Sequence, residues 1–537
     1  MTVFVLGGIA LAVLAAMTSA WWWALAVPVL LVGLVGIYDL VQTQHSILRN
    51  YPVLGHARFA MEAIRPEIQQ YFIERNTDGA PFDRDTRALV YARAKGEEDA
   101  SPFGTERDVN AIGYEFVTHS MGATTAQGAI PSVMVGGPEC TQPYDMSLLN
   151  VSAMSFGSLS GNAIEALNAG AAMGGFLHDT GEGAISPYHL KHGGDLNWEI
   201  ASGYFGCRTD DGHFDPDQFA EKARGETVKT ISIKLSQGAK PGLGGVLPGA
   251  KVNQEIADTR GVEQGETVIS PPSHTAFSTP RGLIEFIGRL RELSGGKPVG
   301  IKLCVGSRHE FLAICKAMVE MESYPDFVIV DGSEGGTGAG PVEFSDHVGM
   351  PLTEGLVFVH NALTGVGVRS HVKVGASGKI ATGIDIVKRI CQGADFTLSA
   401  RAMMFAIGCI QAQACHTNKC PVGVATQDPF RARALRVDDK SVRVRNFHDQ
   451  TIASAHQIVT SMGLEEFAQL HPGLLNRRLE HQVTTTYAEL HEWLTPGQLL
   501  SDVPDDWAND WDLAHPDDFR DRVANRPPGF HPDTFTA

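Results

Sequence analysis

The chain has 537 residues and a mass of 57.7 kDa, enough for one large α/β domain with additional segments. Hydrophobic residues make up 43% of it and charged residues 19%, which excludes a disordered chain. The net charge of −18 excludes nucleic acid as a partner, because phosphate binding requires clustered Lys and Arg.

Two uncharged apolar runs open the chain, Val3–Met17 and Trp21–Ile37, and no charged residue precedes Asp39. Each run is slightly short for a membrane span of about 20 residues, but together they predict a transmembrane hairpin. The cluster Trp21-Trp22-Trp23 suits a membrane–water interface. Basic residues follow the second run at Arg49, Arg58 and Arg65. We therefore expect a protein of the cell membrane whose catalytic part faces the cytoplasm. A cleaved signal peptide is the alternative, and the lack of a basic start counts against it.

The middle of the chain predicts a barrel. From Tyr144 onward, short β-branched or apolar runs alternate with Gly-rich turns and helical segments. The expected strands are Leu148–Ser152, Thr230–Lys234, Val299–Leu303, Phe327–Val330, His371–Val374 and Asp395–Leu398. Strands that alternate with helices imply a parallel sheet. Their span of roughly 250 residues favours an α/β fold of the (β/α)8 TIM barrel type over an open doubly wound sheet.

Four parts follow from these patterns. Residues 1–40 are the expected transmembrane hairpin, and residues 41–110 are a helical lead-in with helix-like stretches around His56–Arg75 and Asp83–Lys95. The barrel occupies residues 111–430. Residues 431–537 are helical and acidic, and they predict a C-terminal helical cap that covers the barrel.

The loops after the expected strands form the candidate binding site, because the chemistry of a barrel lies at the C-terminal ends of its strands. Lys234 ends one strand, and a Lys in the barrel mouth is costly unless it meets an anion or an electron-rich ring. Gly375–Gly378 and Ser399–Arg401 fall where the loops after strands 7 and 8 of barrels bind phosphate. A phosphate site with a Lys over a planar ring indicates flavin mononucleotide, FMN. Glycine loops that merely form tight turns are the alternative.

The expected FMN-binding residues come from seven segments at or after the ends of strands. They are Ser152, Ala153, Met154, Ser155, Thr180, Glu199, Lys234, Gln237, Ser333, Gly335, Gly336, Gly375, Ser377, Gly378, Ser399 and Arg401. The candidates for catalysis are Lys234, which would stabilise negative charge on reduced flavin, and Glu182 and His178, which would transfer protons. Of these two, His is favoured by its intrinsic pKa.

Three of the eight cysteines lie in one short loop, at Cys409, Cys415 and Cys420, and Pro421 follows the last. Closely spaced thiolates before a Pro are typical of a loop that wraps an iron–sulfur cluster. Zinc and inert thiols are the alternatives, but zinc sites prefer shorter first gaps and four ligands. A disulfide is disfavoured in a reducing compartment. Three ligands predict a [3Fe-4S] cluster, whereas a fourth from Cys391 or Cys140 would give a [4Fe-4S] cluster.

These loops resemble the flavin- and cluster-binding synthase domain of glutamate synthase, and in particular the short stand-alone glutamate-synthase-like proteins of bacteria. The matching stretches are Ser152–Ser158, Gly181–Gly183, Ala201–Gly206, Ile233–Gly249, Asp331–Gly338 and Cys409–Gln427, within residues 110–430. The resemblance implies a (β/α)8 barrel with FMN, and a three-iron cluster on the three cysteines. It also implies hydride transfer from reduced flavin to an imine of a 2-oxo acid and ammonia. By the same match, Lys234, Gln237, Ser333, Gly336, Ser377 and Gly378 lie around the flavin.

Three departures limit what the resemblance implies. The chain has no expected glutaminase region, so we do not expect ammonia from glutamine. The family has Lys-Gln where this chain has Trp198-Glu199, and Arg where it has Tyr204, so the pocket is expected to be less cationic and 2-oxoglutarate is in doubt. The hairpin is the third departure, because a soluble synthase does not need one.

The sequence therefore predicts a membrane-tethered oxidoreductase that uses FMN and an iron–sulfur cluster on an amino acid/2-oxo acid couple. A two-electron flavin beside a one-electron cluster requires a one-electron partner, for which ferredoxin, a membrane protein and quinone are the candidates. The alternatives are a subunit similar to N-methylglutamate synthase, a non-catalytic electron-transfer module, and a zinc-stabilised barrel hydrolase.

Overall fold

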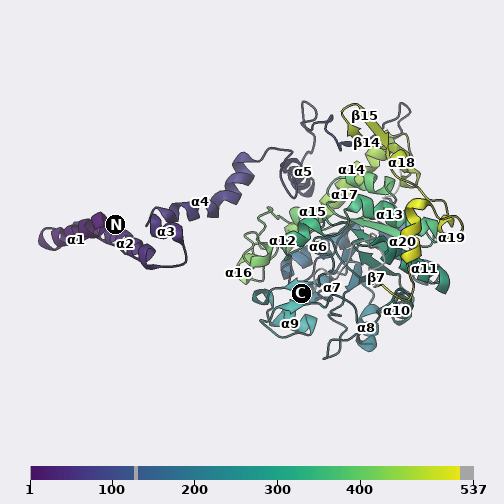
Figure 1. The fold of residues 1–537 in the computed structure, drawn as a ribbon, viewed down its shortest axis with the longest axis horizontal. Coiled ribbons are helices and arrows are strands. Elements are labelled where there is room, and N and C mark those ends of the chain that lie inside the picture. Colours follow the sequence, from purple (N-terminus) through teal and green to yellow (C-terminus); the bar gives the residue numbers. More distant parts are fainter. Residues whose placement is uncertain (1, 126–130, 520–537) are drawn as a thin grey trace, which may run out of the picture. The chain divides into compact units, whose positions relative to one another are not determined.

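A computed structural model describes residues 2–125 and 131–519. Its residues group into two compact units that divide after Arg84, and each is described by itself (Figure 1). The first unit contains the expected hairpin and the start of the lead-in. The second contains the barrel and everything that follows it.

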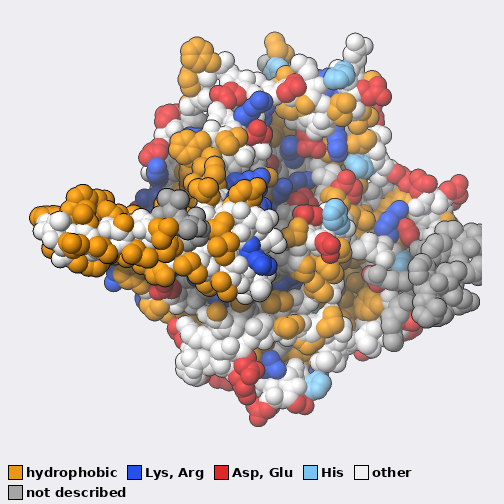
Figure 2. All heavy atoms as spheres, turned by 60° about the vertical axis from the view of Figure 1, so that its left-hand side comes forward, with side chains coloured by type: hydrophobic (Ala, Val, Ile, Leu, Met, Phe, Trp, Pro, Cys, Tyr) orange, Lys and Arg blue, Asp and Glu red, His pale blue; other side chains and the backbone are white. Residues whose placement is uncertain are grey.

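The first unit begins with two apolar helices, α1 (Thr2–Met17) and α2 (Trp23–Val41), joined by the 3-10 turn η1 (Ala20–Trp22). They pack antiparallel, because Gly8 lies against Leu30 and Gly33 lies against Val5. The segment Ala20–Val41 is long and apolar enough to cross a membrane, whereas Phe4–Met17 is a shorter apolar helix. Hydrophobic side chains cover the helices of this unit (Figure 2).

The chain after α2 turns through α3 (Ser46–Asn50) into α4 (Gly55–Ile68), which continues as the π-helical turn η2 (Gln69–Ile73). Asp39, near the end of α2, is fully buried and accepts hydrogen bonds from the Val53 backbone N–H and from His56 Nε2, at 2.8 Å each. These bonds join the end of α2 to the start of α4.

The second unit contains a closed barrel of eight parallel strands surrounded by helices, as the sequence predicts (Figure 1). Around the barrel the strands are β4 (Leu149–Val151), β5 (His178–Asp179), β6 (Leu196–Ile200), β7 (Val228–Lys234), β10 (Val299–Leu303), β11 (Phe327–Asp331), β12 (Lys373–Ser377) and β13 (Phe396–Ser399). The helices after these strands are α6 (Gly161–Gly174), α7 (Pro187–Leu190), α8 (Pro216–Ala223), α9 (Gln254–Arg260), α10 (Pro280–Leu293), α11 (Arg308–Met321), α12 (Val342–His347), α13 (Leu352–Gly365), α14 (Gly383–Cys391) and α15 (Arg401–Ala406).

Six of these strands overlap the expected runs, β12 by only two residues, and β5 and β6 were not among those runs for a physical reason. β5 has only two residues, too few for any periodic pattern. β6 reads Leu-Asn-Trp-Glu-Ile, and its polar residues interrupt the apolar run. Asn197 of β6 faces the barrel interior, where it donates hydrogen bonds to Asp179 Oδ2 at 2.8 Å and to Ser232 Oγ at 2.7 Å. Because these groups satisfy one another, the polar interior is tolerated.

A short antiparallel hairpin, β2 (Ser132–Val135) and β3 (Tyr144–Ser147), lies at the amino-terminal end of the barrel. Its Val135 and Met146 pack in one buried cluster with Phe327 and Phe396, the first residues of β11 and β13. Apolar packing therefore fills this end, and the opposite end, where the strands finish, carries the loops of interest.

The remaining elements flank the barrel. They are α5 (Arg84–Lys95), β1 (Glu115–Val117), β8 (Val246–Leu247), η3 (Gly249–Lys251), β9 (Val268–Ile269), η4 (Cys415–Thr417), α16 (Pro429–Ala432), α17 (Val437–Ser461), η5 (Phe467–Gln469), η6 (Pro472–Leu474), β14 (Leu475–Glu480), β15 (Val483–Thr486), α18 (Tyr487–Leu490), α19 (Gln498–Ser501) and α20 (Asp505–Leu513). The long helix α17 packs closely on α6, where Gly170 leaves room for Val444. The expected helical cap also contains a β-hairpin, β14–β15, which pairs with β1. The last part of the expected cap, 520–537, lies outside the described residues.

Candidate active site

A buried chain of charges lies at the C-terminal ends of β6, β7 and β10. Lys234, the last residue of β7, places Nζ 3.2 Å from Glu182 Oε2 and 3.8 Å from Glu199 Oε1. Glu199 Oε2 in turn accepts a 2.9 Å hydrogen bond from Lys302 Nζ. The side chains of Lys234 and Glu182 are only 9% and 14% exposed. The structure thus brings together the predicted residues Lys234, Glu182 and Glu199, and adds Lys302.

Three cations converge on Glu182. Burial raises its pKa, but the charges of Lys234, Arg260 and Lys240 outweigh this and lower the pKa below its ordinary value. Burial lowers the pKa of Arg260 to about 10 and also lowers that of Lys240, and the Glu182 carboxylate opposes both shifts. Three basic side chains therefore face this one carboxylate, so the mouth of the barrel carries more positive than negative charge around Glu182. An anionic ligand would balance this charge.

Asp179 lies deeper in the barrel, below these charges. Burial and then the Glu199 charge raise its pKa to about 7, while Lys302 opposes the shift. Its Oδ1 accepts a 2.9 Å hydrogen bond from the Gly181 N–H. Burial lowers the pKa of Lys302, but the charges of Glu199, Asp331 and Asp179 together outweigh burial and raise the pKa above its ordinary value. The interior therefore holds titratable groups that the sequence pattern did not single out.

The turn after β5 packs directly on the loop after β4. Gly181 has a φ of +62°, and a Cβ at that position would lie 2.8 Å from the Ser155 backbone nitrogen. Thr180 uses its hydroxyl internally, donating to the Gly181 carbonyl and accepting from the Glu199 N–H. Arg260 donates to Ser155 Oγ at 3.1 Å and so joins this loop to the charged cluster. Of the predicted neighbours in the same loop, Ala153 is half-buried and Met154 is buried.

The loops after β7, β11 and β12 are tied together by Asp331. Its two carboxylate oxygens accept hydrogen bonds from the Ser377 hydroxyl at 2.9 Å and from the Gly238 N–H at 2.8 Å. Ser377 also lies 3.3 Å from the Ser152 hydroxyl. The predicted residues Gln237, Ser333 and Gly335 belong to these loops, in which Ala239 N–H donates to the Ser333 carbonyl and Gly335 N–H to the Gly332 carbonyl. Most of the predicted FMN-binding residues thus surround one mouth.

The loops expected to bind phosphate are shaped partly by packing. Position 375 favours glycine, because a Cβ there would lie 2.5 Å from the Phe396 ring. Ser399 donates its hydroxyl to the Ile380 carbonyl at 2.6 Å. Gly378 has a φ of +149°, which favours glycine, and Arg401 donates to the Glu334 carbonyl at 2.7 Å while its side chain passes over Gly336. Gly375 and the Ser399 hydroxyl therefore have structural roles.

A buried tyrosine–histidine pair borders Lys234. His274 Nε2 lies 2.9 Å from the Lys234 carbonyl, which can only accept, so Nε2 carries the proton. Its Nδ1 then accepts from the Tyr204 hydroxyl, at 3.1 Å, and the Tyr204 oxygen accepts from the N–H groups of Thr275 and Ala276. Burial lowers the pKa of His274 to about 4, so its ring is neutral at neutral pH.

Two predictions about this mouth do not match the structure. The structure does not bring His178 to it, because Asp179 points into the barrel and successive strand residues point to opposite sides. The His178 ring packs against His189 of α7, is fully buried, and has a pKa lowered to about 3 by that burial. Trp198 likewise points outward and stacks on Phe219 of α8. With Lys240 and Arg260 present, the pocket is more cationic than the sequence suggested.

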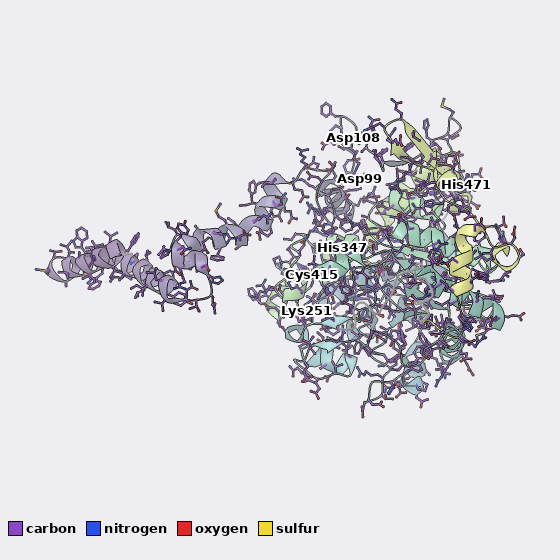
Figure 3. The ribbon with its side chains drawn as sticks, in the orientation of Figure 1. Asp99, Asp108, Lys251, His347, Cys415 and His471 are labelled. Carbon is purple, nitrogen blue, oxygen red and sulfur yellow. The ribbon has the colours of Figure 1, made fainter. Side chains whose placement is uncertain are left out.

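The three predicted cluster ligands lie in one loop after α15, and all eight cysteines are free thiols. Burial, and then the neighbouring thiols, raise the pKa of Cys409 to about 12, and the same two causes raise that of Cys415. The ammonium of Lys251, 2% exposed, faces Cys415 and Cys420, and burial lowers its pKa to about 8. Lys251 also donates to the Ser158 carbonyl at 2.7 Å, and Figure 3 shows it beside Cys415.

The structure groups these thiols in one loop without forming a metal site. Within residues 2–125 and 131–519, no three His, Cys, Asp or Glu side chains are placed to share one metal ion. The loop holds three soft donors beside a buried cation, and the iron–sulfur cluster stays a prediction.

The two proposed fourth ligands lie elsewhere. Cys140 donates to the Gly296 carbonyl at 3.3 Å and interacts with Asp326, at the amino-terminal end of the barrel. Cys391 ends α14, and its thiol forms a hydrogen bond with the backbone of His471. The structure therefore groups three cysteines and leaves these two apart.

Sequence reasoning missed Arg260, Lys240, Lys251 and Lys302 as site residues. Lys240 and the backbone around Lys251 stand in the glycine-rich stretch after β7, and this signal could have found them. Arg260 ends the separate helix α9, and Lys302 lies within an apolar strand. Only the fold brings these two side chains to the mouth.

Known proteins are similar to this chain over the segment that contains these strand-end loops. The profile of the conserved region in glutamate synthase matches residues 138–465. The chain is 38% identical over 464 residues to the glutamate synthase large subunit-like protein YerD of Bacillus subtilis, with 79% of this chain and 88% of YerD covered. It is 32% identical over 319 residues to an archaeal-type glutamate synthase [NADPH] of Thermotoga neapolitana, with 59% and 60% covered.

Longer relatives and solved structures match in part. A glutamate synthase [NADPH] large chain of Bacillus subtilis is 35% identical over 325 residues, which is 59% of this chain and 20% of that one. A mutant flavocytochrome b2 with bound pyruvate has a TM-score of 0.38 at 13% identity, with 83% of this chain and 93% of that chain covered. That likeness adds nothing to the barrel described above. The profile match and the relation to YerD confirm the resemblance seen in the strand-end loops, and the chain belongs to the glutamate synthase family of oxidoreductases.

Proposed function

We propose that this protein is a membrane-tethered oxidoreductase that binds FMN and an iron–sulfur cluster and acts on an amino acid/2-oxo acid couple. Its relatives named glutamate synthase support the reaction class. The chain spans 88% of YerD but about 60% of the archaeal-type relatives. The substrate, the cofactors and the electron partner are therefore argued from the residues of this chain.

The observation that carries the proposal is the group of three cations around Glu182 at the barrel mouth. Lys234, Lys240 and Arg260 all lower the pKa of Glu182. The other carboxylate near Lys234, that of Glu199, already forms a hydrogen bond with Lys302, so the cations outnumber the carboxylates. Amino acids and 2-oxo acids carry at least one carboxylate, and an acidic member of either class carries two. Such a ligand would neutralise the remaining charge, which supports an acidic substrate.

FMN fits the strand-end loops around this cluster. Gly181, Gly336 and Gly378 each lack a side chain where a Cβ would meet Ser155, Arg401 or Leu352 within 3.2 Å, so these loops pack closely together at the strand ends. Lys234 would lie at the ring, and Arg401 with the Gly378 turn would hold the phosphate. FMN, when bound, supplies hydride transfer to or from a carbon–nitrogen bond.

The protein groups have distinct roles in this proposal. Lys240 and Arg260 bind and orient substrate carboxylate, because both stay charged and neither needs to give up a proton. Glu182 stays ionised next to Lys234, and it accepts a proton from the substrate nitrogen when Lys234 Nζ releases its hydrogen bond. The neutral ring of His274 holds the Lys234 carbonyl and hence the end of β7 in place. The inward-facing Tyr204 hydroxyl fixes that ring.

The thiol loop supports an iron–sulfur cluster on Cys409, Cys415 and Cys420. Thiols with raised pKa values are costly to ionise, and bound iron would offset this cost directly. Lys251 contributes a positive charge next to two of the three sulfurs. A cluster, when bound, supplies one-electron transfer, which suits a ferredoxin, a membrane protein or quinone as partner. The apolar helices α1 and α2 favour a partner in the cell membrane, with the barrel on the cytoplasmic side.

Anaerobic purification from membranes followed by analysis of flavin, iron and acid-labile sulfide tests the cofactors. We expect one FMN per chain and an EPR signal of an oxidised three-iron cluster. Anaerobic addition of acidic amino acids should then bleach the flavin absorbance, and ammonia should be preferred to methylamine in the reverse reaction. A colourless protein would refute the proposal, and a flavin that responds only to electron carriers would reduce it to a non-catalytic module.

A further inference from the structure

The helix α4 and its continuation η2 carry an apolar face that no described residue of the first unit covers. This face consists of Leu54, Met61, Ile64, Ile68 and Phe72, which follow one another at intervals of seven, three, four and four residues. All are exposed, Met61 by 68% and Phe72 by 83%. The spacing of one helical turn places them along one stripe. A stripe of this size is expensive in water, so it indicates a surface that is covered in the cell.

Two arginines border this face. Arg58 lies three residues before Met61, and Arg65 lies three residues before Ile68, so both stand one turn from an apolar member. Arg58 Nη2 lies 3.9 Å from Glu62 Oε1, on the side away from the stripe. Long Arg side chains can keep their apolar stems along a hydrophobic surface while their guanidinium groups reach anionic oxygens. An apolar stripe edged with Arg is typical of helices that lie in the headgroup region of a membrane.

The start of α4 is fixed to the end of the apolar hairpin. Asp39 of α2 binds both the Val53 N–H and His56 Nε2. Leu48 of α3 is buried against Gly55, the first residue of α4. The His45 and Phe59 rings lie 5.2 Å apart, centroid to centroid. If α2 crosses a bilayer, its end at Val41 lies at the surface of that bilayer, and this elbow holds the start of α4 at the same depth.

We propose that α4 and η2 lie in the headgroup region of the membrane, with the apolar face of α4 inserted among the first acyl carbons and Arg58 and Arg65 paired with lipid phosphate. This inference rests on the membrane-tethered part of the proposed function. The lipid surface is favoured as occupant because the face is continuous with the hairpin and is edged with cations in a chain of net charge −18. The helix would then anchor the chain at a second point, between the hairpin and the catalytic unit.

The test uses the full-length protein reconstituted in vesicles of phosphatidylcholine and phosphatidylglycerol. A photoreactive phosphatidylcholine with a diazirine on an acyl carbon near the headgroup is activated, and lipid adducts are mapped by mass spectrometry. Trypsin releases the peptide Phe59–Arg75, because the Arg65–Pro66 bond resists cleavage. The paired variants are Met61→Asp with Ile64→Asp on the apolar face, and Ala63→Asp as control. Ala63 lies one turn from Phe59 and Glu67, off the stripe.

We expect lipid adducts on Phe59–Arg75 in the native protein, a several-fold loss in the Met61→Asp/Ile64→Asp variant, and no loss in Ala63→Asp. Labelled hairpin residues with an unlabelled Phe59–Arg75 would overturn this inference and leave the tether intact. Equal loss in the control would also overturn it, because the face would then not be specific. If neither the hairpin nor Phe59–Arg75 is labelled, the tether itself fails, and the flavin and iron contents judge the rest of the proposed function separately.

Discussion

Cys409 and Cys415 are thiols for which burial, and then the neighbouring thiols, disfavour the thiolate. The buried ammonium of Lys251 faces Cys415 and Cys420, and its charge favours the thiolate of Cys415. At the scale of single residues, a bound cation would offset the cost of ionising these thiols.

Replacing each of Cys409, Cys415 and Cys420 by Ser should abolish iron binding and leave flavin binding intact, because the hydroxyl is a poor ligand for iron and the flavin loops are separate. Iron and flavin per chain are measured after anaerobic purification. The control is Cys140→Ser, whose hydroxyl can keep the bond to the Gly296 carbonyl. Iron that persists in any of the three variants would contradict the three-ligand loop.

Asp179 predicts a pH dependence of stability. Its folded pKa is raised to about 7 from an ordinary value of 3.8, so the folded state holds the proton more tightly than the unfolded state. Its favourable contribution is present below pH 4 and is lost as the pH rises through 7. The melting temperature of Asp179→Asn, measured relative to that of the native protein, should therefore rise between pH 5 and pH 8. A constant difference over that range would show that Asp179 does not titrate there.

At the scale of secondary-structure elements, strands and the loops that follow them set the geometry of the barrel mouth. The short hairpin β8 (Val246–Leu247) and β9 (Val268–Ile269) follows β7, and the chain before it passes over Glu182. A Cβ added at Gly245 would overlap the Oε1 atom of Glu182. This close approach positions the carboxylate against Lys234.

Gly245→Ala should displace Glu182 from Lys234 and lower kcat with little effect on folding, because the Glu182 side chain can rotate away. Steady-state kinetics and the melting temperature are measured together. Gly288→Ala serves as control, since nothing lies within 4 Å of the added methyl group on α10. Unchanged kinetics in Gly245→Ala would show that the Glu182–Lys234 pair is not required.

The Lys302–Glu199 pair connects β10 to β6 inside the barrel. Lys302→Met should destabilise the protein by about 3–5 kcal/mol, because it leaves Glu199 buried with only the more distant Lys234. Thermal denaturation measures the loss. The double variant Lys302→Met/Glu199→Met removes both charges and should regain part of the stability. A single variant as stable as the native protein would refute a buried ionised pair.

The whole molecule separates into a unit up to Arg84 and a unit from Asp85 onward. The second contains the barrel, the thiol loop and α5, whose Tyr91 donates to the Cys409 carbonyl at 2.6 Å. A chain of residues 85–537 should therefore appear in the soluble fraction with FMN and iron bound. Fractionation, absorbance and iron analysis check this. A chain that stays with the membrane, or that loses both cofactors, would contradict the separation.

The sequence by itself determined the barrel, because strands that alternate with helices leave few other parallel arrangements. It also determined the thiol loop and the apolar helices, since each is a local pattern of residues close in the chain. Lys234 and Glu182 were predicted from strand-end positions, and the structure places them 3.2 Å apart. The four-part division and the binding role of each predicted site residue stay predictions.

Only the tertiary structure decided which side chains face the mouth. A two-residue strand such as β5 is too short for its sequence to show which residue points inward. In the structure Asp179 points into the barrel, and its neighbour His178 therefore points outward. Arg260 and Lys251 come from segments beyond the strand ends, and Lys302 from within an apolar strand, so their approach to Glu182, the cysteines and Glu199 depends on closure of the barrel. Local pattern fixes the elements, but contacts between residues distant in the chain exist only after those elements pack.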